Sequence, residues 1–449
     1  MQRGVYWARE VVARTECVMI AGCRILRSKG HVAVRATTAL NTLLGLEGVV
    51  VEDVRFACDR VVVEVRLRRK RLECPVAGCG YTTRARFDTR REKSWWRSLD
   101  LGAHETIVTA RLRRLDCPDH GVLVEAVPFA RPRVRFTRDF EDLVAWCASK
   151  TDKTAVTRLL RIAWPTVGAI VERVVADGLD PGRLDGLVDI GADEISWKRH
   201  HNYLTVVVDH ATGDVIFTGE GKDTAALDAF FAELGPERSA RLRAVSLDMG
   251  KAYPKSVAKD GHAPQAVICW DPFHVVKMGT EALNTVRRGH WRQLLATTDP
   301  AVAHRFKGAR WALLRNPEDL SDRQADALAA IRRSGGAVWR AYQLKEALRA
   351  VFAGDLTSDE VAHLLTRWCS RAQRSRLPAF VKLARTIRAH SDGIQAAIRL
   401  GLSNGRVEGR NATIRLITRR AFGFHTAKAA AALVMLCCGP ITLLLPHEK

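Results

Sequence analysis

The sequence lacks an uninterrupted hydrophobic run long enough to cross a membrane. Residues 429–445 are nearly uncharged, but Gly439-Pro440 interrupts them, and a membrane-spanning helix needs about 20 consecutive apolar residues. We interpret this stretch as a buried helix followed by an apolar tail. A secretory signal, a lipidation signal and a clear basic amphipathic helix are missing as well. We therefore expect a cytoplasmic protein with no membrane partner.

Cysteine and acidic residues are also scarce. The 11 cysteines in 449 residues do not have the dense, regular spacing of a disulfide scaffold. Lys and Arg number 71 against 49 Asp and Glu, so the formal net charge is +22. An excess spread along the chain favours a polyanionic partner bound through phosphate contacts. A hydrophobic share of 47% is typical of a globular protein, and the length predicts about two to four domains.

The N-terminal part of the chain predicts an extension and a β-rich domain. Residues 1–35 have weak periodicity, and we treat them as an extension of unknown role or the result of a misplaced start codon. A helical pattern begins at Ala36. Alternating apolar and polar residues predict strands over residues 49–54, 61–67 and 106–115. We assign residues 36–135 to this domain.

One group of cysteines is patterned. Cys74 and Cys79 form a Cys-x4-Cys pair, and Cys117 and His120 form a Cys-x2-His pair. Two such pairs, brought together by antiparallel strands, match the ligands of a closed tetrahedral Zn²⁺ site. We predict structural zinc; the alternative is that these are ordinary turn cysteines. His104 is a spare imidazole that we do not predict to be a ligand.

A basic run with aromatic residues lies between the two pairs. This combination suits contact with a nucleic-acid backbone, whereas a solvated charged face is the competing interpretation. The candidate DNA-binding residues of this run are Arg84, Arg86, Arg90, Arg91, Lys93, Trp95, Trp96 and Arg97.

Residues 136–180 predict three helices, over 140–148, 154–161 and 165–176. The third begins with a proline at an early helical position. A short second helix, a brief turn and a longer third helix indicate a helix-turn-helix, whose third helix, here carrying Thr166, enters the major groove of double-stranded DNA. A linker rich in Gly, Pro and Asp follows over residues 178–186.

The remaining pattern completes a multidomain α+β protein. Strands are predicted over residues 187–195, 202–209, 215–218, 244–247 and 267–270, with helices over 224–234 and near Tyr253. Three strands in hairpins, followed by alternating strands and helices, are the order of a ribonuclease-H-like mixed sheet, which we assign to residues 181–275. Residues 276–400 predict an all-α block, and residues 401–449 predict a helix carrying Glu408 and a C-terminal helix.

A strongly basic helix is predicted within residues 402–420. Ser403 is a candidate N-cap. One polar face is formed by residues at spacings of 4, 3 and 4, namely Asn404, Glu408, Asn411 and Arg415. The opposite face offers Val407, Ile414 and Leu416 for packing, and the other basic residues are Arg406, Arg410, Arg419 and Arg420. A surface helix with an ion pair is the alternative.

Three acids are candidates for metal-dependent phosphodiester chemistry. That chemistry needs carboxylates that converge on two divalent cations, and Mg²⁺, with Mn²⁺ as an alternative, prefers such oxygen ligands. Asp193 lies in or at the end of the first predicted strand, Asp248 lies at the end of the fourth, and Glu408 lies on the late helix. Glu194 or Asp189 could replace Asp193, and Asp248 could merely cap the next helix. Asp271, with His274, is an additional candidate that supports the site or contacts the scissile DNA.

Five motifs occur together: Ala192-Asp193-Glu194, residues 203–209, Ser246-Leu-Asp248-Met-x-x-x-Tyr253, Asp271-x-Phe-His274-Val, and Ser403-Asn-Gly-x-x-Glu408-Gly-x-Asn411. From about residue 36 to residue 425, the chain thereby resembles the DDE transposases of bacterial insertion sequences, in particular the ISL3 group. The resemblance implies that Asp193, Asp248 and Glu408 are the catalytic triad. It also implies an N-terminal zinc module, a helix-turn-helix, a helical insertion in the ribonuclease-H-like fold, and binding to the terminal inverted repeats of the element.

We therefore expect a transposase that cuts a DNA strand at the element end and joins the freed 3′-hydroxyl to target DNA. Asn411 and Arg415, beyond Glu408 on the same helix, are placed to hold substrate phosphates or to orient Glu408. Joining two ends in one complex predicts a homodimer or higher oligomer, and action on DNA predicts association with the bacterial nucleoid. The alternatives are a DNA-binding regulator and a nuclease of the same fold that cuts without joining.

Overall fold

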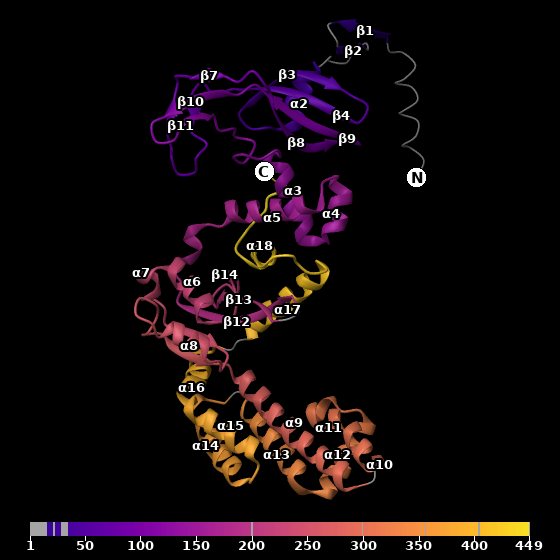
Figure 1. The fold of residues 1–449 in the computed structure, drawn as a ribbon, viewed down its shortest axis with the longest axis vertical. Coiled ribbons are helices and arrows are strands. Elements are labelled where there is room, and N and C mark those ends of the chain that lie inside the picture. Colours follow the sequence, from indigo (N-terminus) through magenta and orange to yellow (C-terminus); the bar gives the residue numbers. More distant parts are fainter. Residues whose placement is uncertain are drawn as a thin grey trace. The chain divides into compact units, whose positions relative to one another are not determined.

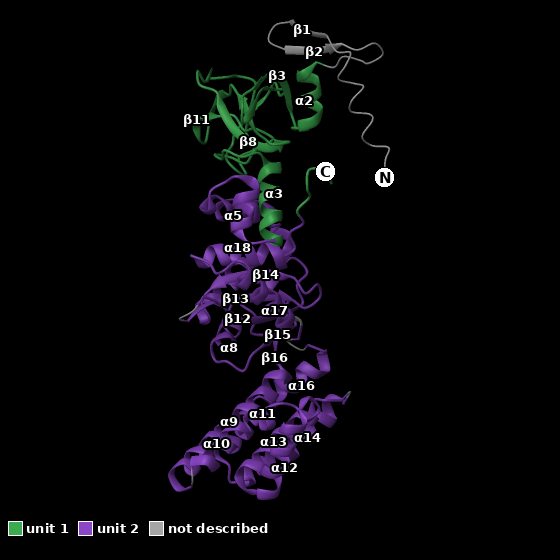
Figure 2. Ribbon diagram, turned by 90° about the vertical axis from the view of Figure 1, so that its right-hand side faces the viewer, with its two compact units in different colours: residues 1–150, 443–449 green, residues 151–442 purple. Residues whose placement is uncertain are grey.

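The computed structural model describes residues 35–198, 201–298, 300–354, 356–402 and 405–448, except the side chain of Arg406, and the backbone of the pair β1 (Glu16–Ile20) and β2 (Cys23–Arg27). Most of the predicted extension, the candidate N-cap Ser403 and its neighbour Asn404 lie outside the described residues. The chain divides into two compact units, residues 1–150 with 443–449, and residues 151–442 (Figure 2). The division falls after the first of the three helices predicted over residues 136–180.

The first unit contains a four-stranded sheet. Helix α2 (Ala36–Leu44) precedes it, and its order is β3 (Val49–Phe56), β4 (Arg60–Leu67), β9 (His104–Ala110) and β8 (Ser94–Leu101). β4 and β9 are parallel, and the outer pairs are antiparallel. Val61, Val63 and Val65 alternate along β4 and are buried with Trp96, whose ring meets Phe129 edge to face at 5.0 Å. The strands predicted over residues 49–54 and 61–67 are confirmed.

A smaller β-structure carries the patterned cysteines. It consists of the pair β5 (Leu72–Glu73) and β6 (Thr82–Thr83), and of a sheet formed by β11 (Gly121–Val124), β10 (Arg113–Cys117) and β7 (Asp88–Thr89). The single strand predicted over residues 106–115 is wrong, because β9 and β10 belong to different sheets. Every second residue is buried from Thr106 to Leu112, and the next buried residues are Leu115 and Cys117. The alternation of burial therefore changes phase between the two strands.

The three helices of the predicted helix-turn-helix are confirmed. They are α3 (Arg138–Lys150), the last helix of the first unit, and α4 (Lys153–Leu160) and α5 (Trp164–Gly178), which open the second unit. Asp152 caps α4 by accepting a hydrogen bond from the Ala155 N–H at 3.0 Å. Arg161 ends α4 in the left-handed conformation with φ of 53°, which turns the chain into α5. The short helix η2 (Pro181–Leu184) follows.

A five-stranded mixed sheet forms the centre of the second unit. Its order is β14 (Val215–Glu220), β13 (Asn202–Asp209), β12 (Asp189–Lys198), β15 (Ala244–Leu247) and β16 (Val267–Trp270). The first three strands are antiparallel neighbours, whereas β12, β15 and β16 are parallel. Three helices connect the later strands: α6 (Thr224–Leu234), α7 (Pro236–Ser239) and α8 (Ala252–Val257). The predicted order of strands and helices in this region is confirmed.

A block of helices follows the last strand (Figure 1). It comprises α9 (Pro272–Thr297), α10 (Pro300–Gly308), α11 (Arg310–Leu314), η3 (Pro317–Asp319), α12 (Asp322–Ser334), α13 (Gly336–Val351), α14 (Ser358–Arg374), α15 (Pro378–Ala389) and α16 (Ser391–Leu400). The chain ends with α17 (Gly405–Arg420) and the mostly buried α18 (Ala427–Cys438). Among the helices of the described ranges, none combines the length and the apolar character needed to span a bilayer.

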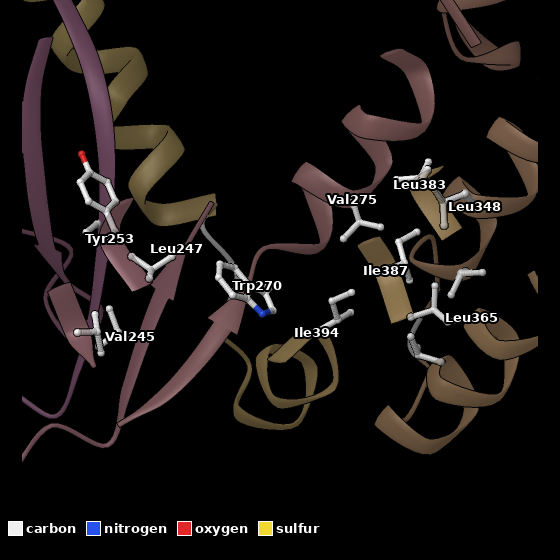
Figure 3. Packing of buried hydrophobic residues seen from close by; sticks show 14 of the residues in the cluster. Val245, Leu247, Tyr253, Trp270, Val275, Leu348, Leu365, Leu383, Ile387 and Ile394 are labelled. Atoms are coloured by element: carbon white, nitrogen blue, oxygen red, sulfur yellow. The ribbon is translucent and has the colours of Figure 1, made fainter. Parts of the chain in front are cut away.

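One hydrophobic cluster joins this block to the sheet (Figure 3). Trp270 at the end of β16 packs against His390 with ring centroids 4.7 Å apart. A Cβ atom at Gly393 of α16 would lie 2.3 Å from Trp270 Cδ1, so only glycine permits this approach. These contacts place α16 against the end of β16, shortly before α17 begins.

Candidate functional site

Three aspartates follow residues that are paired across the parallel strands β12, β15 and β16. In the register of the sheet, Ala192 pairs with Leu247, and Leu247 pairs with Trp270. An aspartate follows each of these residues: Asp193 within β12, Asp248 directly after β15 and Asp271 directly after β16. Because neighbouring strands lie about 4.8 Å apart, the register alone brings these carboxyl groups to one edge.

Asp193, Glu194 and Asp248 form a carboxylate cluster, with one oxygen from each lying within 4.8 Å of the others. Burial and the charge of Asp248 raise the pKa of Asp193 to about 7, and the same causes raise the pKa of Glu194. The folded chain therefore opposes full ionisation of this cluster, and a bound cation would remove that opposition.

Two oxygen acceptors at the cluster are open for a ligand. Asp248 Oδ1 and Asn411 Oδ1 are buried, and neither has a hydrogen-bond partner in the part of the chain that the structure describes. Hard cations such as Mg²⁺ and Mn²⁺ take carboxylate and amide oxygens as ligands. The residues therefore fit a divalent cation.

His274 connects Asp248 to Asp271. Its Nε2 lies 2.7 Å from Asp248 Oδ2, and its Nδ1 lies 3.0 Å from Asp271 Oδ2. Burial lowers the pKa of His274, but its hydrogen bonds and the charges of both aspartates raise it to about 10, so the ring donates from both nitrogens. Asp271 is buried and also accepts the Phe273 N–H, which caps α9. These contacts hold one oxygen of Asp248 in place.

Helix α17 reaches the same cluster from a distant part of the sequence. Asn411 Nδ2 donates to Asp193 Oδ2 at 2.5 Å, and Asn411 is only 1% exposed. Val407, one turn earlier, fits against Gly191, where a Cβ atom would approach its Cγ2 to 2.5 Å. The helix is thus held against β12 by a glycine contact and by one hydrogen bond to the candidate acid.

The structure corrects the predicted faces of this helix. Asn411 is buried on the same side as Val407 and Ile414, whereas Glu408 and Arg415 are exposed. Leu416, predicted to pack, is 65% exposed, and Ile417 is buried in its place. The helix is rotated because Asn411, a polar residue, takes a position in the packed face by bonding to Asp193.

The three predicted acids are only partly brought together. Asp193 and Asp248 share a cluster, but Glu408 belongs to neither of the two carboxylate-containing clusters among the described residues. It lies three residues before Asn411, a rise of about 4.5 Å along the helix. The alternative acid Glu194 lies in the cluster, whereas Asp189 is paired with Arg243.

The predicted zinc ligands converge in the first unit. One ligand atom from each of Cys74, Cys79, Cys117 and His120 lies within 4.8 Å of the others. The Cys79–Cys117 sulfur separation is 3.7 Å, and His120 Nδ1 lies 3.8 Å from Cys74 Sγ and 3.5 Å from Cys117 Sγ. Tetrahedral bonds of about 2.3 Å to sulfur require separations of about 3.8 Å. The geometry fits one ion.

The Cys117 thiol is prepared for ionisation. Burial raises its pKa, but hydrogen bonding with His120 and with backbone groups lowers it to about 7. A thiolate is the form that binds metal. His104 begins β9 and is not part of the cluster.

The basic run separates into exposed and buried residues. Arg84, Arg86, Arg91, Lys93 and Trp95 are exposed, Arg90 is half-buried, and Lys93 pairs with Glu64. The prediction that Trp96 and Arg97 contact DNA is wrong for this structure, because both are buried. Trp96 points into the sheet core, and Arg97 pairs with Asp100 and lies over the Phe140 ring at 5.1 Å. In the helix-turn-helix, Thr166 is half-buried in the first turn of α5.

Two aromatic residues near α17 were not anticipated. Trp197, at the end of β12, and Phe422, just after α17, line a cavity of about 1040 Å³. The sequence signal was an aromatic residue beside glycine, Phe422-Gly423, directly after a basic helix.

Comparisons with known proteins agree with this arrangement. The ISL3 model of DDE transposases, described as "Transposase", matches residues 190–433. A second model, the helix-turn-helix domain of transposase family ISL3, matches residues 125–175. The first range contains all three predicted acids, and the second contains α3, α4 and most of α5.

Three curated relatives are similar over most of their length. Transposases for insertion sequence element IS1557 from two Mycobacterium tuberculosis strains are each 43% identical over 433 residues, which cover 90% of this chain and 95% of each relative. The transposase for insertion sequence element IS1001 from Bordetella parapertussis is 28% identical over 331 residues, covering 73% of this chain and 80% of the relative.

Proposed function

Because this chain belongs to the ISL3 family of DDE transposases, we propose that it binds the terminal inverted repeats of its insertion sequence and catalyses strand cleavage and strand transfer with two divalent cations. The observation that carries the proposal is that carboxyl oxygens of Asp193 and Asp248 lie within 4.8 Å of each other, and that Asp248 Oδ1 has no hydrogen-bond partner among the described residues. The strand order β14-β13-β12-β15-β16 supports a ribonuclease-H-like core, interrupted after β16 by the helical insertion of residues 276–400.

Asp193, Asp248 and Glu408 are the proposed ligands of two Mg²⁺ ions, with Mn²⁺ as an alternative. When bound, such ions activate the attacking oxygen and stabilise the leaving oxygen. The chain's own contribution is to orient the ligands. Asn411 fixes Asp193, and the Asp271–His274 pair fixes Asp248. Arg415 is exposed on the same helix as Glu408 and is available to a DNA phosphate.

The N-terminal part is proposed to bind DNA. Structural Zn²⁺ held by Cys74, Cys79, Cys117 and His120 would fix the small β-structure that displays the exposed cations Arg84, Arg86 and Arg91. Trp95 is exposed beside Arg135, which lies 5.0 Å from its ring. Helix α5, with Thr166 in its first turn, is proposed to enter the major groove.

Two element ends must be joined in one reaction, so we propose a homodimer or higher oligomer on DNA. We also propose that the protein acts in the cytoplasm at the nucleoid, where its substrate lies. The functional division is the one expected from the sequence: zinc module, residues 36–135; helix-turn-helix, residues 136–180; catalytic core, residues 181–275 and 401–449.

The test is strand transfer by the purified chain on labelled terminal-repeat DNA with Mg²⁺. Wild type is expected to give joined product, and Glu408→Gln is expected to give none. Glu237→Gln changes an exposed carboxylate on α7 of the same unit and should join normally. DNA binding without cleavage by wild type would instead indicate a regulator, and cleavage without joining would indicate a nuclease.

A further inference from the structure

The cavity beyond the acidic cluster has the chemistry of a nucleotide site. It is an open pocket of about 1040 Å³, lined by α4, α5, the end of β12 and the segment after α17. Its walls combine aromatic rings with cations, chiefly Trp164, Trp197, Phe422, Lys153, Lys198 and Arg419. Lys198 and Arg419 are exposed and have no carboxylate partner among the described residues.

Phe422 is displayed to solvent instead of being packed. It is 88% exposed, although phenylalanine normally buries its ring. Its backbone is in the left-handed region with φ of 54°, which is unusual for a bulky residue. Its neighbours Ala421 and Phe424 are buried and anchor the segment on both sides. The Phe422 ring is therefore kept exposed to solvent by a segment that is anchored on both sides.

Trp197 supplies an independent indication of a ligand. Its side chain lines the cavity and is 6% exposed, and its Nε1–H is buried without a hydrogen-bond partner in the described part of the chain. A buried donor is costly to leave unpaired. The Nε1 atom is itself shielded from solvent, so an acceptor of a ligand would pair it only if this wall of the cavity rearranges on binding.

The cavity is lined by residues of β12, which carries Asp193 and Glu194, and of α17, whose Asn411 donates a hydrogen bond to Asp193. Trp197 is four residues beyond Asp193 on β12, about 13 Å along the strand. Thr418, another wall residue, is seven residues beyond Asn411 on α17, about 10 Å along the helix. One DNA strand advances about 3.4 Å per nucleotide. A strand that follows these elements from the acids would reach the cavity after about three or four nucleotides.

We propose that this cavity holds an unpaired nucleotide of the DNA strand, with its base stacked on Phe422 and its phosphate near Lys198 and Arg419. Aromatic rings stack on any base, and cations track the backbone. The Trp197 Nε1–H would donate to an acceptor of the nucleotide. The inference rests on the proposed action on DNA and adds that the strand is unpaired about three or four nucleotides from the cleaved bond.

The test scans the fluorescent base 2-aminopurine through duplexes of the terminal repeat and its flank, using the full-length chain without added Mg²⁺. Wild type is expected to change the emission several-fold at one or two adjacent positions, because the base leaves the stack. Phe422→Ala should abolish the change, Phe422→Trp should restore it, and Trp197→Phe should weaken it. Leu416→Ala, an exposed apolar residue of α17, is the matched control and should behave as wild type.

The outcomes separate this inference from the proposed function. If the wild type binds the duplex and transfers strands but no 2-aminopurine position changes its emission, the nucleotide site alone is overturned. The same conclusion follows if Phe422→Ala shows the same change in emission as wild type. Absence of duplex binding by wild type would overturn both. Displacement of the signal by free deoxynucleoside monophosphate as readily as by an unlabelled strand would contradict a site for a nucleotide within DNA.

Discussion

The two candidate metal-binding clusters of this chain differ in how completely the folded protein assembles them. The cysteine–histidine cluster has all four predicted ligands at tetrahedral separations. The acidic cluster has two of the three predicted acids, with a raised pKa at Asp193 and with an Asp248 oxygen that no described residue contacts by a hydrogen bond. The first arrangement suits an ion that stabilises the fold, whereas the second suits ions that arrive with the substrate.

The physical origin of the difference is charge and chain distance. Neutral thiols and an imidazole can approach one another before metal binds, and short β-strands carry them. Carboxylates repel one another, and Glu408 comes from a helix beyond the whole helical block. A site that costs stability when empty is typical of catalysis rather than of scaffolding.

The largest expected effect comes from removing a proposed zinc ligand. Binding of structural Zn²⁺ in small domains contributes about 10 to 16 kcal/mol to folding. Cys117→Ser should therefore unfold the small β-structure of the first unit and release zinc, measured by thermal unfolding and by native mass spectrometry. Cys58→Ser, which changes an exposed free cysteine, is the control. Unchanged zinc content in Cys117→Ser would show that Cys117 is not a zinc ligand.

Removing a proposed catalytic acid should have the opposite effect on the fold. Asp193→Asn is expected to reduce strand transfer by about 10³-fold or more, since metal stabilisation of the transition state is worth several kcal/mol. Its unfolding temperature without Mg²⁺ should stay the same or rise, because the folded state disfavours the Asp193 charge. A lower unfolding temperature together with normal joining would remove the contrast between the two clusters.

Removing the hydrogen bond from Asn411 of α17 to Asp193 should have a smaller effect. Asn411→Leu removes the hydrogen bond to Asp193 while keeping a buried side chain of similar size. Groups that orient metal ligands typically alter metal affinity about 10- to 100-fold. The Mg²⁺ concentration for half-maximal joining should rise by that factor, whereas Thr413→Ala on the exposed side of α17 should leave it unchanged. Equal Mg²⁺ dependence in both variants would show that Asn411 does not position Asp193.

The exposed cations near the zinc cluster should have the smallest effect. Arg86→Gln is expected to weaken binding to all DNA sequences alike and to reduce the slope of log affinity against log salt by about 1. Arg60→Gln, an exposed arginine paired with Asp59, is the matched control. A salt slope that falls equally in both variants would indicate that the basic run has no special contact with DNA.

The parts of the molecule that could be predicted are those with a local pattern. The Cys-x4-Cys and Cys-x2-His pairs, the capped helix α4 and the aspartates after apolar strands are each visible within a few residues. Contacts between distant residues could not be predicted. Trp95 and Trp96 are neighbours on β8 and point to opposite sides, and Arg97 is buried by Asp100, Glu105 and Phe140. The rotation of α17 depends on the Asn411–Asp193 bond across the fold.

The most direct measurement is an electron paramagnetic resonance titration of Mn²⁺ with the chain bound to terminal-repeat DNA, comparing wild type, Glu408→Gln and Glu194→Gln. The central claim is that Asp193 and Asp248 are completed by Glu408 when substrate is present. It predicts about two bound ions in wild type and in Glu194→Gln, and fewer in Glu408→Gln. Full binding by Glu408→Gln, with loss in Glu194→Gln, would contradict the claim and make Glu194 the third ligand.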